Sequence, residues 1–505
     1  MEALSAFVFV GFMGAGKSTA ARAAAAELGV EPLDSDREVE RAIGEPIESY
    51  FDREGEHAFR AREEEVVLGL LQRQGARVIA LGGGALGSER VRDALRGHTV
   101  IHLQVRADEA WRRASGKGRP LARDRGRFEQ LKQDREAVYE SVASAWLPPM
   151  PRDGVRRAMG ALAALETAPA GTRLAWAAAV SGHYPVFFGR GLVASGFFHP
   201  PDVRRFAVTD QNVAAVITVP ADGQLAVPAG EEQKTLARAE ELLRFLASSG
   251  AARGDVLVAV GGGVVGDLAG FAASVYQRGM RWVGIPTSLV AQVDSAYGGK
   301  TGVDLPEAKN YVGSYHHPAA VLVDPSLLET LPPEEAAAGY AEVVKTALIA
   351  GGPLWARVRE GGPVDDEMIW RCLRTKLAIV AEDERDSGRR QVLNLGHTVG
   401  HAIEAATGYG RYRHGEAVAI GLLAALRLSG RDALRSEVEG LLTARGLPVR
   451  FEGAAVDDVL QYLARDKKRA DDRVPLVLVQ APGDVTPGHD VAAAELRAAV
   501  EEVAG

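Results

Sequence analysis

The chain has 505 residues, of which 47% are hydrophobic and 25% are charged, and its net charge is −8 at neutral pH. This length predicts about two to four domains, and the acidic balance argues against a nucleic-acid-binding protein. The single cysteine, Cys372, excludes a disulfide framework and a thiolate-rich metal site. No apolar run is as long as a membrane span, and the N-terminus has no signal-peptide pattern, so we expect a cytoplasmic protein.

The first predicted elements are a buried strand at Phe7–Val10 and a helix at Thr19–Leu28. Residues 11–18 join them and fit the phosphate-loop pattern G-x-x-x-x-G-K-[ST]. Glycine backbone lets N–H groups close around phosphate oxygens, and the helix N-terminus adds positive potential. We therefore expect ATP here, with Lys17 at the β- and γ-phosphates and the Ser18 hydroxyl on Mg²⁺. The predicted ATP-binding residues of this loop are Gly14, Ala15, Gly16, Lys17, Ser18 and Thr19.

Charged residues further along the first domain indicate which class of substrate accepts the phosphate. Asp34 and Asp36 follow the short run 30–33, where a second strand should end. One such acid can hold Mg²⁺ through water and the other can accept a proton from a substrate hydroxyl. Arg60 lies in a predicted helix, where an arginine suits a small carboxylate.

Two glycine-containing segments complete the pattern of the first domain. Gly82–Gly84 follow a predicted strand at Val78–Leu81, so a ligand can approach the backbone closely there. Arg119 comes late in the domain, after a further predicted strand at Thr99–Leu103, and suits a mobile lid over the transferred phosphate.

In this order and spacing, these features resemble the shikimate kinase family over residues 5 to about 145. The resemblance implies a P-loop kinase domain with a parallel sheet that uses Mg-ATP. By the resemblance, Asp36 receives the hydroxyl proton, Asp34 helps to place Mg²⁺ and Arg119 closes over ATP. It assigns shikimate binding to Asp36, Arg60, Gly83 and Arg135. A degenerate nucleotide-binding module without catalysis is the alternative for this half.

A second α/β domain follows a break in the pattern. Prolines at 148, 149 and 151 and the stretch 167–172 interrupt the first domain. We place the first domain at 1–165 and a linker at 166–173. The sequence predicts a Rossmann-like α/β part at 174–326 and a mostly α-helical part at 327–505. The strand candidates of the α/β part are Arg205–Thr209, Val256–Val260, Trp282–Ile285 and Ala320–Val323.

The glycine block Gly261–Asp267 follows the strand candidate at 256–260. Glycines between a strand and a helix suit close approach to a pyrophosphate, which indicates a dinucleotide. Glu231 and Lys234 lie in a segment that could reach the ribose or nicotinamide side. The segment Asp294–Thr301 and the pair Lys309-Asn310 combine lysines, an amide and glycine backbone, which favours an anionic substrate; a solvated basic loop is the alternative.

Histidines in the last third predict a metal site. His397 and His401 have the i, i+4 spacing that puts both on one helix face, and spacing alone favours them as metal ligands. His414 offers a third imidazole and Glu342 a carboxylate. The adjacent pair His316-His317 precedes a proline in a loop and is not expected to bind metal.

At this point the second half resembles the 3-dehydroquinate synthase family over about residues 173–490. The motifs that carry the resemblance are Gly261–Asp267, Asp294–Thr301, Lys309-Asn310, Ala341–Lys345, Asn394–Glu404 and His414–Ala417. The resemblance implies Zn or Co held by Glu342, His397 and His414, with His401 left for the substrate or its phosphate. It also implies NAD as a cofactor. It assigns NAD binding to Glu231, Lys234, Gly263, Val264, Val265, Gly266, Asp267, Thr287, Ser288, Lys300 and Lys309.

The same resemblance implies the reaction of the second half. The sugar acid phosphate 3-deoxy-arabino-heptulosonate 7-phosphate is oxidised by NAD⁺, loses phosphate, is reduced again and closes to 3-dehydroquinate. The expected substrate residues are Asp294, Lys300, Asn310, Lys345, Lys376, Arg390, Asn394, His401 and Lys467 or Lys468. The residues expected to take part in catalysis in the two halves are Lys17, Asp36, Arg119, Asp294, Lys300, Lys345, Arg390 and His401. A homodimer formed through the synthase half is also expected.

Two alternatives remain open for the second half. A metal- and NAD-dependent polyol dehydrogenase would release NADH and would not need Lys300, Lys309, Arg390 and the Lys467 pair. A sister cyclase for another sugar phosphate shares the elimination and aldol chemistry. Ala296-Tyr297 and the segment 302–304 depart from the expected pattern and flank the pocket.

Overall fold

The computed structural model describes residues 5–73, 75, 77–115, 120–150, 154–469 and 476–505. The chain packs as two compact units. The first comprises residues 1–178 and 183–192, and the second comprises residues 179–182 and 193–505. Within the described residues, no helix combines the length and the apolar character needed to cross a membrane.

The sheet of the first unit places the phosphate loop at the end of an inner strand. Its strand order is β2-β3-β1-β4-β5-β6-β7. The pairs are parallel except for the antiparallel β6–β7 hairpin. Strand β1 lies between β3 and β4, and the loop after it opens at the carboxyl edge, where α/β sheets bind ligands. The strands are β1 Phe7–Val10, β2 Leu33–Asp34, β3 Val78–Ala80, β4 Thr99–Leu103, β5 Ala145–Leu147, β6 Arg173–Ala178 and β7 His183–Phe188.

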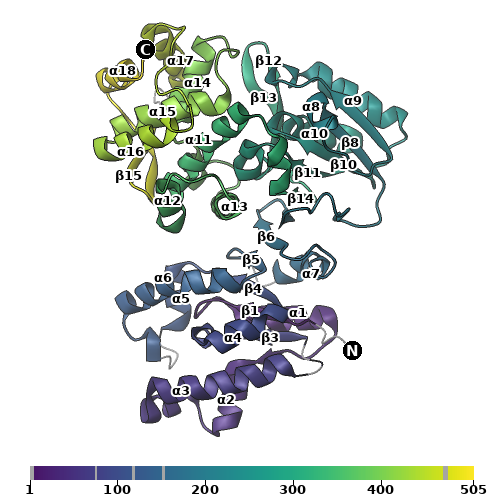
Figure 1. The fold of residues 1–505 in the computed structure, drawn as a ribbon, viewed down its shortest axis with the longest axis vertical. Helices are drawn as coiled ribbons and strands as arrows, with labels where there is room; N and C mark the ends of the chain where they lie inside the picture. The colour runs from purple at the N-terminus through teal and green to yellow at the C-terminus, as the bar shows by residue number, and fades with distance from the viewer. Residues whose placement is uncertain (1–4, 74, 76, 116–119, 151–153, 470–475) are drawn as a thin grey trace. The chain divides into compact units, whose positions relative to one another are not determined.

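Helices cover this sheet and build the core of the first unit (Figure 1). Val8 and Val10 of β1 share a buried cluster with Val67 of α3 and Phe128 of α6. Helix α1 packs against β1, β3 and α7. The helices are α1 Lys17–Leu28, α2 Ser35–Ile43, α3 Ile47–Gln72, α4 Glu89–Ala94, α5 Ala107–Ala114, α6 Arg125–Val142 and α7 Gly154–Ala164.

The second unit contains a parallel sheet of strand order β14-β11-β10-β8-β9. Helices α9 and α10 share a buried cluster with β8 and β10 that includes Leu242 and Leu268. An antiparallel hairpin, β12–β13, packs against α10. The elements of this part are β8 Arg205–Asp210, α8 Gln211–Ala214, β9 Gly223–Val227, α9 Leu236–Ser248, β10 Val256–Gly261, α10 Gly263–Val275, β11 Arg281–Pro286, β12 Lys300–Leu305, β13 Ala308–Tyr315 and β14 Ala320–Val323.

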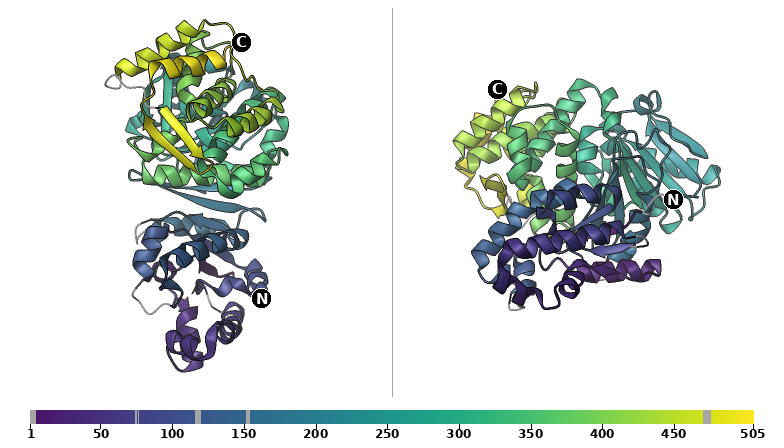
Figure 2. Two further views of the ribbon diagram at one scale, coloured as in Figure 1. Left: turned by 90° about the vertical axis from the view of Figure 1, so that its left-hand side faces the viewer. Right: turned by 60° about the horizontal axis from the view of Figure 1, so that its bottom comes forward.

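The remainder of the second unit is mainly helical, and its helices gather beside one another (Figure 1). The predicted helical character of this part omitted one feature, because residues 476–489 form the hairpin β15–β16 (yellow in Figure 2). This hairpin packs against α11 and α15. The elements are α11 Pro333–Ala350, α12 Gly352–Arg359, α13 Asp366–Glu382, α14 His397–Ala406, α15 His414–Leu428, α16 Asp432–Thr443, α17 Val456–Arg469, β15 Leu476–Ala481, β16 Asp484–His489 and α18 Ala493–Glu502.

The predicted fold class is confirmed, with a parallel-sheet P-loop unit followed by an α/β part and a helical part. The strands predicted at Thr99–Leu103 and Ala320–Val323 have the observed bounds. Strand β5 escaped prediction because it has only three residues and ends at the prolines that were read as a break.

Candidate active sites

The phosphate loop of the first unit depends on its glycines. Gly11, Gly14 and Gly16 have φ values of 142°, 83° and 90°, a region that favours glycine. A Cβ at Gly11 would lie 2.5 Å from the carbonyl oxygen of Leu103, so a side chain would not fit. Lys17 begins α1 and its Nζ donates to the carbonyl oxygens of Gly11 and Phe12, at 2.9 and 3.2 Å. The loop therefore curls around the amine that is expected at the phosphates.

The two acids of the first unit lie where β2 passes into α2. Asp34 is the last residue of β2 and caps α2, since its Oδ1 accepts the Asp36 N–H at 3.1 Å. Ser35 between them is buried and its Oγ accepts the Gly82 N–H at 2.7 Å. This bond ties the acids to the glycine segment that follows β3.

The residues expected to bind shikimate converge on Gly82–Gly84. A Cβ at Gly82 would lie 2.6 Å from Oδ1 of Asp36, and a Cβ at Gly84 would lie 2.1 Å from Nη1 of Arg60. Arg60 Nη1 also donates to Glu63 at 2.5 Å. Burial raises the pKa of Glu63, and the attraction of Arg60 offsets only part of this effect. The Asp36 carboxylate and the Arg60 guanidinium thus both lie against the backbone of this glycine segment.

Helix α6 closes the same cluster from another direction. Arg135 Nη1 donates to the Gly83 carbonyl at 3.0 Å, and the Tyr139 hydroxyl donates to the same oxygen at 2.5 Å. Asp36, Arg60, Gly83 and Arg135 are therefore brought together, although they come from four separate segments. Arg119, predicted as the lid arginine, lies outside the described residues.

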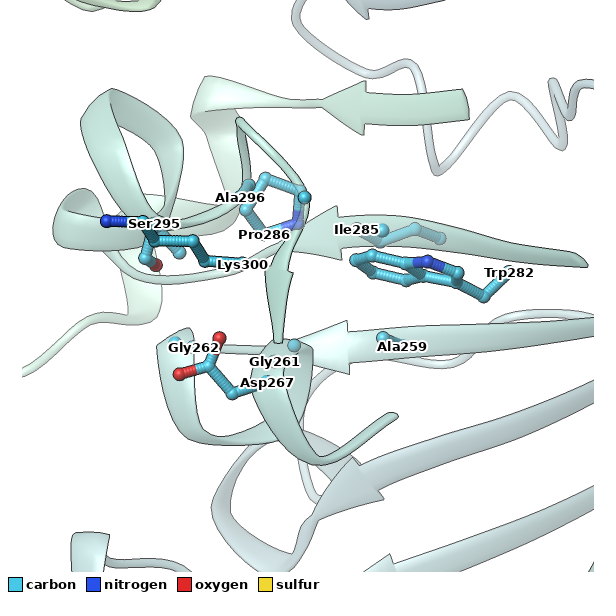
Figure 3. A pocket seen from close by; sticks show the side chains of 15 residues that line it. Ala259, Gly261, Gly262, Asp267, Trp282, Ile285, Pro286, Ser295, Ala296 and Lys300 are labelled. Atoms are coloured by element: carbon cyan, nitrogen blue, oxygen red, sulfur yellow. The ribbon is translucent and has the colours of Figure 1, made fainter. Parts of the chain in front are cut away.

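A pocket of the second unit lies at the ends of β10 and β11 (Figure 3). Gly261, Gly262 and Gly263 form its wall, and Asp267 and Lys300 line it from α10 and β12. Figure 3 shows the Asp267 carboxylate beside the glycine turn. The block predicted to approach a dinucleotide therefore opens into a pocket, with Gly266 in its lining and Val264 and Val265 in the same first turns of α10.

Charges beside this pocket are linked through Lys234. Its buried Nζ lies 3.2 Å from Oδ2 of Asp267 and 3.2 Å from Oε1 of Glu231. Lys309 Nζ lies 3.8 Å from the same Glu231 oxygen. Burial raises the pKa of Asp267 to about 6, although Lys234 acts in the opposite direction. Of the other residues expected at NAD, Thr287 donates its N–H to the Gly261 carbonyl, and Ser288 lies beside Gly262.

The carboxylate of Glu342 meets two imidazoles. Glu342 Oε1, on α11, lies 3.5 Å from Nε2 of His397, on α14, and 3.5 Å from Nε2 of His414, on α15. His401 joins the same group, because ring nitrogens of His397, His401 and His414 lie within 4.8 Å of one another. The pair favoured by spacing, His397 and His401, and the set implied by the resemblance, Glu342, His397 and His414, thus lie in one cluster.

The charges of this cluster suit a bound cation. Burial lowers the pKa of His397 to about 3, helped by the charge of Lys345, so its imidazole is neutral and able to ligate metal. Burial opposes a charge on His414, but bonds with Glu342 and Glu404 outweigh it and raise its pKa to about 10. A positive charge is therefore favoured between Glu342 and Glu404, and the nitrogen and oxygen donors are those that zinc and cobalt accept.

Two buried lysines and Asp294 lie next to the histidines. Lys345 Nζ contacts Asp294 Oδ2 at 2.5 Å and also pairs with Glu342. Lys376, on α13, pairs with Asp294 Oδ1 and donates to the Asp294 carbonyl at 2.8 Å. Burial would raise the pKa of Asp294, but the two lysines together lower it. This array is strongly polar and buried, as a site for an anionic sugar requires.

The other predicted substrate residues lie in several further segments of the second unit. Lys300 begins β12 and pairs with Asp386 at 2.5 Å, and buried Arg390 donates to the Gly298 carbonyl at 3.2 Å. Asn394 is exposed just before α14, and Asn310 lies in β13 with a φ of 56°. The side chains of Lys467 and Lys468 lie outside the described part of the chain.

Three acids of these sites escaped prediction from the sequence. Glu63 forms an ion pair with Arg60, and Asp386 forms one with Lys300. Glu404 accepts a hydrogen bond from Lys309 Nζ at 3.1 Å and lies 3.4 Å from His414 Nδ1. Glu63 could have been found from its i, i+3 spacing to Arg60. Asp386 and Glu404 pair with residues distant in sequence, so no local pattern marks them.

The two halves match the sequence models of different families. Residues 13–148 match shikimate kinase. Residues 224–338 match the N-terminal part of 3-dehydroquinate synthase, and residues 339–469 match its C-terminal part. A 3-dehydroquinate synthase of Streptococcus pneumoniae is 45% identical over 280 residues, which cover 53% of this chain and 79% of that protein.

Solved structures resemble the second half as well. A 2-deoxy-scyllo-inosose synthase complexed with carbaglucose-6-phosphate, NAD⁺ and Co²⁺ is 26% identical with a TM-score of 0.58, covering 65% of this chain and all of that one. A 2-epi-5-epi-valiolone synthase from Streptomyces hygroscopicus, with NAD⁺ and Zn²⁺ bound, is 25% identical with a TM-score of 0.56. It covers 63% of this chain and 96% of that one.

Proposed function

Because the chain belongs to the 3-dehydroquinate synthase family and carries a shikimate kinase unit ahead of it, we propose that each half uses the side chains gathered in its own unit. The first half phosphorylates the 3-hydroxyl of shikimate with Mg-ATP. The second converts 3-deoxy-arabino-heptulosonate 7-phosphate to 3-dehydroquinate and phosphate, with NAD and zinc or cobalt. The observation that carries the synthase assignment is the meeting of Glu342, His397 and His414 from three helices.

In the kinase half, the residues divide between the two substrates. Lys17 and the loop N–H groups would hold the phosphates, and Ser18 and Asp34 would hold Mg²⁺. Asp36 would accept the proton of the attacking hydroxyl. Arg60 and Arg135 would bind the carboxylate of shikimate over Gly83, in the bidentate manner that guanidinium groups favour. Glu63 supports this role because it fixes the direction of the Arg60 side chain. Arg119 would close over ATP.

In the synthase half, Glu342, His397 and His414 would hold the metal. The NAD side would be lined by Glu231, Lys234, Gly263, Val264, Val265, Gly266, Asp267, Thr287, Ser288, Lys300 and Lys309. When bound, NAD supplies the redox chemistry and the metal supplies Lewis-acid chemistry at the oxidised hydroxyl. The protein itself binds and orients the substrate. Lys345 and Lys376 form ion pairs with Asp294 and would place positive charge beside the metal ligands. This charge would stabilise negative charge that develops on the substrate during the reaction.

The remaining polar residues would hold the two charged ends of the substrate. Lys300 and Arg390 would bind anionic oxygens, assisted by the amides of Asn310 and Asn394 and by Lys467. His401 lies on the exposed side of α14 and within reach of the metal-site histidines, so its imidazole would meet the substrate phosphate.

Phosphate release from 3-deoxy-arabino-heptulosonate 7-phosphate tests the synthase assignment. With NAD⁺ present, the purified chain should release phosphate, a chelator should abolish release, and zinc or cobalt should restore it. No release from a folded, metal-loaded sample would favour a sister cyclase, which the solved neighbours make the second candidate. Accumulation of NADH instead of phosphate would indicate a dehydrogenase.

We further propose a cytoplasmic homodimer formed through the synthase half, with a linker at 166–173 and a change from the NAD-binding to the helical part near 326. The resemblance of the second half to synthases supports the dimer. Light scattering should then give twice the chain mass of 53.6 kDa. Brief proteolysis should cut first near the linker, and a single cut elsewhere would contradict that boundary.

A further inference from the structure

The glycine turn before Lys300 is packed against two particular side chains. Gly298 and Gly299 have φ values of 91° and 69°. A Cβ at Gly298 would lie 2.6 Å from Nη2 of Arg390, and a Cβ at Gly299 would lie 2.6 Å from Nδ1 of His317. The His316 N–H also donates to the Gly299 carbonyl at 2.8 Å. The path of this turn is therefore set by where Arg390 and His317 lie.

One acidic residue, Glu384, holds both of those side chains. Its carboxylate accepts the Ser181 N–H at 2.9 Å and the Ser181 hydroxyl, and it lies 3.2 Å from Nε2 of His317. Its backbone carbonyl accepts from Nη1 of Arg390 at 2.5 Å. Glu384 is 5% exposed, yet bonds with Ser181 and His317 outweigh the effect of burial and lower its pKa to about 2. The carboxylate thus stays charged throughout the physiological range.

The turn and Arg390 carry two of the cations assigned to the substrate. Lys300 follows Gly299 directly and pairs with Asp386, two residues after Glu384. Arg390 donates from one guanidinium nitrogen to Glu384 and from another to Gly298, at 2.5 and 3.2 Å, which fixes the plane of the group. A planar guanidinium binds an oxyanion well only when its orientation is set.

We propose that Glu384 is a positioning residue of the synthase half, which with His317 and Ser181 fixes the distance and direction between Lys300 and Arg390. This inference rests on the proposed function, because those two cations are the proposed anion-binding groups. Glu384 itself is not placed against the substrate. The pair His316-His317 is not expected to bind metal, and in this proposal His317 instead helps to position Lys300 and Arg390.

The matched variants His317→Ala and His317→Gln test this role. An amide at 317 can still donate to Glu384, whereas alanine cannot. His317→Ala and Glu384→Gln should each raise the KM for 3-deoxy-arabino-heptulosonate 7-phosphate about tenfold, with less than about a threefold change in kcat. His317→Gln should restore most of the KM. Ser181→Ala should have a smaller effect than Glu384→Gln, because its backbone N–H remains.

Several readouts separate positioning from stability. Zinc content, NAD affinity and shikimate phosphorylation should match the wild-type chain in every variant. A lowered melting temperature with unchanged KM would overturn the proposal, and so would equal KM values for His317→Ala and His317→Gln. Failure of the wild-type chain to release phosphate would instead count against the proposed function.

A double-mutant cycle keeps the proposal testable if Glu384→Gln does not fold. Gly299→Ala should raise KM, because the added Cβ meets the His317 ring and the positive φ disfavours alanine. In a His317→Ala background, the first of these two costs disappears. The combined effect should therefore be smaller than the product of the single effects. Independent effects would overturn the proposal.

Discussion

At the scale of single residues, the proposed metal group of Glu342, His397 and His414 has a neighbouring carboxylate that is not one of its proposed ligands. Glu404 is 1% exposed, and its two oxygens face different partners, with Lys309 Nζ at 3.1 Å and His414 Nδ1 at 3.4 Å. A carboxylate on the far nitrogen of an imidazole ligand fixes the ring and its tautomer. Glu404 therefore links the metal group to Lys309, which is assigned to the NAD side.

We predict that Glu404→Gln weakens zinc binding by about 10–100-fold, because the amide keeps the shape of the carboxylate but loses its charge. Competition with a chromophoric chelator, in protein without NAD, measures the affinity. Glu439→Gln on α16 changes the net charge equally and should leave the affinity unchanged. Equal zinc affinities for the Glu404→Gln and wild-type chains would show that His414 needs no second partner.

At the scale of elements, the geometry of the proposed metal group depends on how closely α14 and α15 approach each other. A Cβ at Gly421 of α15 would lie 2.0 Å from the carbonyl oxygen of Gly396 and 2.9 Å from the N of Gly400. Both contacts are with backbone, which cannot rotate away. Gly396 directly precedes His397, and His414 begins α15. A change in the distance between the two helices should therefore also change the distance between the two imidazoles.

Gly421→Ala should therefore push the helices apart and destabilise the synthase unit by about 1–3 kcal/mol, the usual cost of overpacking. Zinc affinity should fall with it. Gly440→Ala on α16 is the control, since no heavy atom lies within 4 Å of its added Cβ and alanine favours a helix by about 1 kcal/mol. Calorimetry of the two variants should show shifts of opposite sign. A stable Gly421→Ala chain would mean that the helices can separate without cost.

At this scale, the sequence predicted the local motifs better than the distant residues that contact them in the fold. The phosphate loop, the glycine block after β10 and the His397–His401 spacing are local patterns, and each has a local physical cause. The meeting of Glu342 with His397 and His414 is not local, since 55 and 72 residues separate them along the chain. The family resemblance suggested that set, whereas spacing alone favoured the pair His397 and His401 as ligands. The role proposed for Glu384 could be inferred only from the folded chain, because Ser181 and His317 lie 203 and 67 residues away in the sequence.

At the scale of the whole molecule, the contacts described for each proposed site lie within one unit. The phosphate loop, the acids after β2 and the Arg60 cluster all belong to the first unit, and the metal and dinucleotide groups belong to the second. No side chain is shared between the two described sets. The two activities should therefore fail separately.

We predict that Lys17→Met lowers shikimate-dependent ADP formation by at least about 100-fold, as loss of one electrostatic contact to a transition state does, and leaves phosphate release unchanged. His414→Ala should abolish phosphate release and leave ADP formation unchanged. Parallel assays on both variants measure this. Loss of both activities in either variant would show that one unit depends on the other.

The chemistry of the two reactions also argues against direct transfer between the sites. The synthase half produces 3-dehydroquinate, whereas the kinase half consumes shikimate, so no molecule passes from one site to the other without further reactions. An equimolar mixture of the Lys17→Met and His414→Ala chains should then perform both reactions at half the wild-type rate per chain, because each unit acts alone. The enzymes that convert 3-dehydroquinate to shikimate are then added to this mixture and to a wild-type sample with the same concentration of active synthase and kinase sites. Both samples should form shikimate 3-phosphate from the heptulosonate phosphate at the same rate. A faster rate for the wild-type chain would reveal protected transfer and would give the fusion a kinetic purpose.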